Sequence, residues 1–145
     1  MQITIREILK EDKTAVLEMM RVFYASPAVY TNGSEQIFLT DIENCLTNTN
    51  YLQGFIVESS SKILGYAMIA KSFSTEFGKP CIWLEDLYVK EEFRGLGIGK
   101  TVIDFITKKY DGSLFRLEVE EENESAIKLY KKCGFTTLPY MEMKK

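Results

Sequence analysis

The residues best suited to chemistry in this chain form a glycine-rich segment from Arg94 to Thr101. Its sequence is RGLGIGKT, with three glycines at alternate positions between two basic residues. Glycine lets backbone N–H groups approach an anion closely, and the positive end of a helix dipole favours phosphate. Arg94 and Lys100 can add charged hydrogen bonds to phosphate oxygens. The segment therefore predicts a pyrophosphate site.

Two common phosphate-binding motifs do not fit this spacing. A P-loop has four residues between its first glycine and its Gly-Lys-Thr, whereas three residues separate Gly95 from Gly99 here. The dinucleotide motif G-x-G-x-x-G also fails, because the third glycine comes one position early. An enzyme that binds nucleotide phosphates through Gly99-Lys100-Thr101 is therefore a weaker hypothesis.

A second motif begins at Asn123 and reads NESAIKLYKKCGF. Helical spacing places Asn123, Ala126 and Tyr130 on one face of a helix that Gly134 should end. The two motifs, in this order, resemble the acyl-CoA-binding signatures of the GNAT superfamily of N-acetyltransferases. The resemblance covers roughly residues 82–135, and the first half of the chain matches only in its predicted element order.

The resemblance implies that the chain binds acetyl-CoA. The pyrophosphate would lie at the glycine segment, and the pantetheine arm would pair with the preceding strand where the next strand, ending at Val119, splays away. A backbone amide near Tyr88 would polarise the thioester carbonyl. The cofactor-binding residues expected on this basis are Leu87, Tyr88, Val89, Arg94, Gly95, Leu96, Gly97, Ile98, Gly99, Lys100, Thr101, Asn123, Ala126 and Tyr130.

The same resemblance casts Tyr130 as the general acid that protonates the leaving thiolate. An amine is protonated near neutral pH, so a general base must also be present. Glu85 and Asp86 are adjacent on a strand, so at most one is expected to face the cleft. A similar Glu-Asp pair in the polyamine-acetylating branch favours Glu85. Glu118 is the second candidate, and Asp86 or a chain of waters stays open.

The leading hypothesis is an N-acetyltransferase that moves an acetyl group to a primary amine of a small molecule or peptide in a ternary complex. The alternative is a non-catalytic module that senses acyl-CoA. The chain has no histidine, so neither Cys81 nor Cys133 has the activating partner that a covalent acyl-enzyme requires. The residues do not identify the acceptor, and the resemblance also allows a homodimer.

Composition limits the other functions. The 145 residues suit one domain, residues 1–145, and the net charge of −3 argues against broad nucleic-acid binding. Without histidine, and with three widely spaced cysteines, no metal site or disulfide framework is expected. No apolar run approaches membrane-spanning length and no secretory signal is evident, so we expect a cytoplasmic protein that does not bind a membrane.

Hydrophobic periodicity predicts alternating strands and helices, and the resemblance implies an α/β fold with a mixed central sheet flanked by helices. The predicted order is β-α-α-β-β-β-α-β-α-β, which is also what the resemblance implies. Strands are expected over residues 3–6, 54–58, 63–70, 83–89, 114–119 and 135–143, and helices from Asp12 to Ser26, from Ser34 to Leu46, from Gly97 to Tyr110 and from Asn123 to Gly134.

Overall fold

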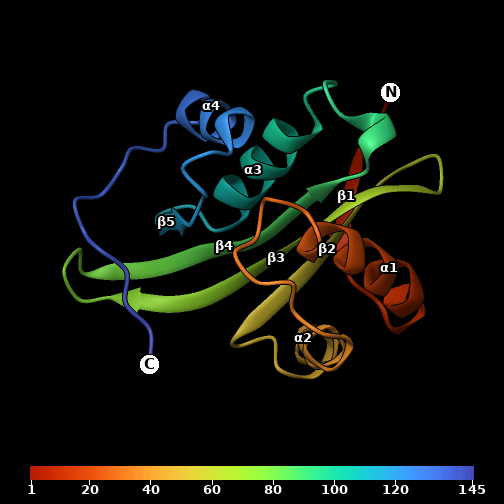
Figure 1. Ribbon diagram of the computed structural model, residues 1–145, viewed down its shortest axis with the longest axis horizontal. Helices are drawn as coiled ribbons and strands as arrows, with labels where there is room; N and C mark the ends of the chain where they lie inside the picture. The colour runs from red at the N-terminus through yellow and green to blue at the C-terminus, as the bar shows by residue number, and fades with distance from the viewer.

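The computed structural model describes residues 1–145 and has one five-stranded sheet in the order β1-β2-β3-β4-β5 (Figure 1). Neighbouring strands are antiparallel from β1 to β4, whereas β4 and β5 are parallel. The strands are β1 (Thr4–Glu7), β2 (Leu52–Ser59), β3 (Lys62–Ser74), β4 (Lys79–Val89) and β5 (Leu114–Leu117). The predicted hairpin of β2 and β3 is confirmed, as is the parallel pair joined by a crossover helix.

Four helices cover the two faces of the sheet (Figure 1). Helices α1 (Lys13–Tyr24) and α2 (Glu35–Thr47) pack on one face, and α3 (Ile98–Lys109) and α4 (Glu124–Lys132) lie on the other side. Ser34 caps α2 by accepting a 3.2 Å hydrogen bond from the amide of Ile37. Two short 3₁₀ segments, η1 (Lys10–Asp12) and η2 (Glu91–Phe93), precede α1 and the glycine segment.

Asp12 lies at the start of α1, where the sequence predicts a helix to begin, but its side chain does not cap this helix. Its carboxylate accepts a 2.7 Å hydrogen bond from the amide of Leu9 and pairs with Arg6, so it closes the 3₁₀ turn before α1 instead. The Arg6 guanidinium also holds the pKa of the Asp12 carboxyl below its usual range. Asp12 thus fixes the connection from β1 to α1.

The sheet divides the core into two layers. One layer packs α1 and α2 against side chains such as Ile56, Tyr66 and Met68, and the other packs α3 against Phe55, Val57 and their neighbours. At Gly65 of β3, a Cβ atom would come within 2.1 Å of the carbonyl oxygen of Tyr88. A side chain at this position would therefore displace the end of β4. The resemblance implies that residues at this end of the strand bind the cofactor.

The predicted strand over residues 135–143 is wrong, because the chain forms no strand after α4. Pro139 has no N–H to give to a ladder, and Met141 and Met143 are 85% and 89% exposed, so this segment offers no apolar face to bury. It crosses the ends of β3 and β4 (Figure 1) and is held there by a 2.6 Å hydrogen bond from Tyr140 to Glu76. The rest of the predicted α/β order is confirmed, and none of the helices is long and apolar enough to cross a membrane.

Candidate active site

An opening between β4 and β5 defines the candidate site. The two strands pair from Cys81 with Leu114 to Leu84 with Leu117, and no pairing follows. Strand β4 continues to Val89, so its last five residues have no strand partner on the β5 side. The predicted splay is confirmed, although β5 ends at Leu117 and not at Val119.

A β-bulge lies where the two strands part. Asp86 pairs with Met68 and Leu84 pairs with Ile69, which leaves Glu85 as the extra residue of β4. Leu84 and Leu87 both pack into the core layer under α3, so the two residues between them turn toward the face covered by α1 and α2. The expectation that Glu85 and Asp86 face opposite sides is therefore wrong, because the bulge breaks the alternation.

Glu85 and Asp86 nevertheless have different surroundings. Asp86 is only 3% exposed, and its two oxygens accept hydrogen bonds from Tyr24 (2.9 Å) and Tyr66 (2.7 Å). Glu85 is exposed. Its pKa is raised, first because nearby atoms exclude water from part of its carboxyl group and then because Asp86 and Glu142 carry like charge. Of the two, only Glu85 has a carboxylate free to meet an acceptor.

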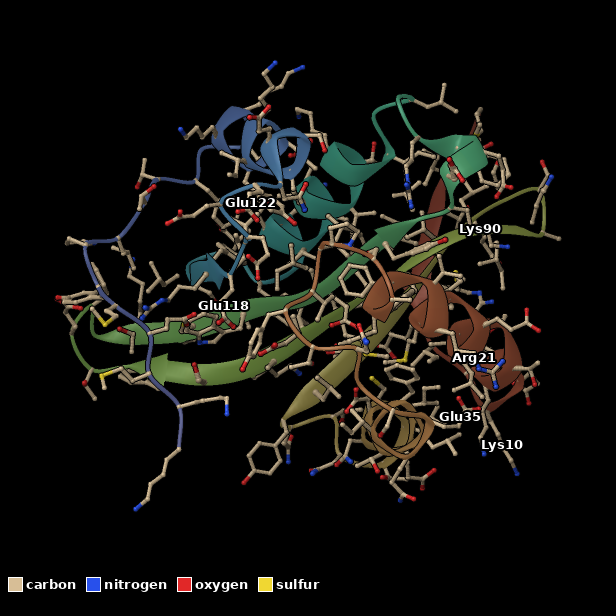
Figure 2. The ribbon with its side chains drawn as sticks, viewed as in Figure 1. Lys10, Arg21, Glu35, Lys90, Glu118 and Glu122 are labelled. Atoms are coloured by element: carbon tan, nitrogen blue, oxygen red, sulfur yellow. The ribbon has the colours of Figure 1, made fainter.

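Glu118 follows β5 (Figure 2). It lines a groove of about 610 Å³ that Tyr130 also lines. The neighbouring carboxyl group of Glu142 raises the pKa of Glu118 to about 7, with burial and the charge of Glu85 contributing. A carboxyl group with this pKa can exchange a proton near neutral pH. Both predicted candidates for the general base, Glu85 and Glu118, thus lie near the end of β5.

The second motif forms α4 as predicted. The Asn123 side chain caps the helix, accepting a 3.4 Å hydrogen bond from the amide of Ala126, so its carbonyl oxygen already has a partner. Tyr130 is partly buried and its ring meets Phe135 edge to face at 5.9 Å. Burial, with a smaller effect of Cys133, raises the pKa of the Tyr130 phenol, which keeps it protonated as a proton donor must be.

The glycine segment presents a row of free amides. None of the backbone N–H groups of residues 95–100 donates a hydrogen bond to the protein, and the first one used belongs to Thr101. Gly95 and Gly97 have φ angles of +77° and +78°, and a Cβ atom on either would meet nothing within 4 Å. Free amides beside open space at the start of α3 are the arrangement that a pyrophosphate group requires.

The other predicted residues of this segment have additional contacts. A Cβ atom on Gly99 would lie 2.9 Å from Leu129, so this glycine allows α3 to approach α4. The Nε of Arg94 donates a 2.8 Å hydrogen bond to the carbonyl oxygen of Val89, and Lys100 pairs with Asp104 at 2.6 Å. Arg94 is thus bound to the end of β4, and Lys100 is paired with a residue one turn further along α3.

We expect Gly97→Ala to weaken CoA binding about tenfold, because a left-handed conformation costs an alanine about 1–2 kcal/mol and the loop would relax away from its amide arrangement. Calorimetric titration with CoA measures the change. Gly78→Ala is the matched control, since Gly78 also has positive φ (+65°) and open space but lies in the turn between β3 and β4. Equal affinity in both variants would remove the segment from the cofactor site.

Comparison with known proteins agrees with this geometry. Residues 6–135 match the model of the acetyltransferase (GNAT) family. The chain belongs to this family. Among GNAT relatives, the thialysine N-epsilon-acetyltransferase of Sus scrofa is 39% identical over 85 residues, which are 57% of this chain and 49% of that protein. The chain thus spans about half the length of this curated relative.

Two other proteins match over nearly the whole chain. The spermine/spermidine N(1)-acetyltransferase of Bacillus subtilis (strain 168) is 22% identical over 141 residues, or 93% of this chain and 88% of that protein. The structure of AAC(6')-Iy in complex with the bisubstrate analogue CoA-S-monomethyl-acetylneamine superposes with a TM-score of 0.82 at 18% identity, covering 100% of this chain and 98% of that one. These matches support the GNAT fold.

The partners of Asp86 could not be predicted from the sequence. Tyr24 ends α1 and Tyr66 lies in the middle of β3, so their convergence on one carboxylate depends on the packing of α1 against the sheet. The positions of both tyrosines within apolar periodic stretches indicated burial. The local spacing of residues does not show that both hydroxyl groups bind the carboxylate of Asp86.

Proposed function

We propose that this GNAT domain transfers an acetyl group from acetyl-CoA to a primary amine in a ternary complex. The observation that carries the proposal is the end of β4, which has no partner on the β5 side and leads through η2 to the free amides of residues 95–100. A pantetheine arm in this opening would use backbone groups of residues 87–89, and its pyrophosphate would accept hydrogen bonds from the amides.

The reaction then needs three proton transfers. Glu85 takes the first proton from the ammonium group, and the neutral nitrogen attacks the thioester carbonyl to form the new C–N bond. A backbone amide near Tyr88 stabilises the oxyanion. The C–S bond breaks as Tyr130 gives its proton to the departing thiolate, and the nitrogen releases its remaining extra proton, which restores the phenol of Tyr130. Glu118 is the alternative base, because it lies in the same groove as Tyr130.

The charge around the opening favours an acceptor with more than one positive group. Burial and the charges of Asp86 and Glu85 raise the pKa of Asp41, on α2, to about 6, and no basic side chain contributes to this shift. Arg21, the basic residue in the last turn of α1, is already paired with Glu35 (Figure 2). The names of the relatives agree with this chemistry, since thialysine and spermine each carry several amino groups.

The test is transfer of labelled acetyl groups from acetyl-CoA to polyamines, thialysine, single amino acids, peptides and aminoglycosides. We expect product with acceptors that carry two or more amino groups, and little with monoamines. Tight CoA binding without transfer to any amine would indicate an acyl-CoA sensor. Calorimetry that showed ATP binding and no CoA binding would instead support the nucleotide-phosphate hypothesis.

A further inference from the structure

Asp86 is the least exposed carboxylate of the chain, and the reaction proposed above does not use it. It lies next to Glu85 at the bulge of β4 and accepts hydrogen bonds from α1, through Tyr24, and from β3, through Tyr66. Three elements therefore meet at one carboxylate group. The segment that leads from α1 to α2 begins directly after Tyr24 and passes over the sheet (Figure 1).

Aromatic packing fixes both phenols that bind Asp86. The ring of Phe23 meets Tyr24, Tyr66 and Tyr88 at centroid distances of 5.2, 6.3 and 6.2 Å. Tyr66 also stacks on Tyr88 at 6.1 Å. A tyrosine packed on several sides has few alternative rotamers, so its hydroxyl group holds a partner in one position.

Asp86 cannot itself accept the proton of an amine in this arrangement. Both oxygens already accept a hydrogen bond, and 3% exposure leaves no approach for a substrate. Two phenol donors offset part of the cost of burying its charge, a cost that an apolar residue at this position would avoid. The arrangement is therefore suited to fixing the backbone around Glu85.

We propose that Asp86 is a positioning residue for acetyl transfer, which anchors the β4 bulge to Tyr24 and Tyr66 and thereby aims Glu85 at the acceptor. The inference rests on the proposed function, because it takes Glu85 as the base. It adds that the end of α1 and the bulge move as one unit. Loss of the anchor should misplace Glu85 without disturbing the cofactor segment at the other end of β4.

The electrostatic surroundings give this role a distinctive readout. The titratable groups around Glu85 and Asp86 are Tyr24 on α1, Asp41 and Cys45 on α2, Tyr66 on β3, Glu118 after β5 and Glu142 near the carboxyl terminus. Burial raises the pKa of Glu85, and the charge of Asp86 raises it further. Activity that needs ionised Glu85 is lost as the pH falls through this pKa. Removal of the Asp86 charge should therefore move the acidic limb of the pH profile of kcat/KM to lower pH.

The test is Asp86→Asn, measured as kcat, as KM for acetyl-CoA and as the pH dependence of kcat/KM. We expect kcat to fall at least about tenfold, because small misplacement of a catalytic group is costly, while KM for acetyl-CoA stays within about twofold. The acidic limb should move to lower pH. Asp12→Asn is the matched control, since Asp12 is also a buried carboxylate (7% exposed) but is bound to Arg6 and Leu9 away from the bulge.

Tyr24→Phe tests the same anchor if Asp86→Asn does not fold. It removes one hydroxyl group and keeps the ring packing, so we expect several-fold lower kcat with unchanged KM for acetyl-CoA. Normal kcat in Tyr24→Phe, or an Asp86→Asn variant that only loses thermal stability as Asp12→Asn does, overturns the positioning role and leaves acetyl transfer standing. Absence of acetyl transfer by the unaltered protein would instead overturn the proposed function, and this inference with it.

Discussion

Tyr130→Phe should lower kcat by about 10²- to 10⁴-fold, the usual contribution of a positioned general acid, while CoA binds with nearly unchanged affinity. The substitution removes only the phenol hydroxyl and keeps the ring that packs against Phe135. The departing thiolate then leaves without a proton donor from α4. Steady-state kinetics combined with CoA calorimetry separates the two effects.

Tyr110→Phe provides the matched control for this experiment. Its hydroxyl donates a 2.5 Å hydrogen bond to Gln53, whose side-chain amide in turn donates to Glu7 at 2.6 Å. Loss of that bond should reduce the free energy of unfolding by about 1 kcal/mol and leave kcat unchanged. A Tyr130→Phe variant with the same profile as Tyr110→Phe would make Tyr130 a packing residue.

Glu85→Gln should lower kcat/KM by a similar 10²- to 10⁴-fold and remove the acidic limb of its pH profile. Glutamine fits the same space but cannot take a proton from the amine. Because the pKa of Glu85 is raised, this limb in the unaltered protein should lie above the range of an ordinary glutamate. Its activity therefore rises with pH through the pKa of Glu85 and does not fall.

Glu118→Gln distinguishes the two candidate bases. Its carboxyl group has a pKa of about 7, owing chiefly to Glu142. If Glu118 is the base, Glu118→Gln causes a larger loss of kcat/KM than Glu85→Gln does. Glu142→Gln then moves the acidic limb of the pH profile from near pH 7 to lower pH. If Glu85 is the base, as we propose, Glu118→Gln keeps most of the activity and Glu142→Gln has a small effect.

Local sequence signals predicted most of the fold because they depend on short-range physics. Helix α2 begins after a serine cap, and α4 ends before Gly134, whose φ of +96° suits glycine. The crossover from β4 through α3 to β5 followed from periodicity alone. The predicted strand at residues 135–143 failed because Pro139 has no N–H for a ladder and the segment offers no apolar face to bury.

Only part of the candidate site could be predicted from the sequence. The free amides and positive φ angles of the glycine segment follow from residue type, so the sequence could indicate an anion site. The bulge at Glu85 could not be predicted, because it is a mismatch between β3 and β4 that appears only when the strands are aligned. The same holds for Asp86, whose partners are 62 and 20 residues away in the chain.

The unpaired end of β4 also links folding to substrate supply. A pantetheine arm that pairs with the open edge of β4 would bind the folded state and not the unfolded chain. Each tenfold rise in cofactor concentration above the dissociation constant would therefore add about 1.4 kcal/mol to the free energy of unfolding. Where acyl-CoA is scarce, residues 85–89 of β4 would keep an edge without a strand partner on the β5 side. Cellular abundance of the domain would then follow the acyl-CoA pool even with no change in its synthesis.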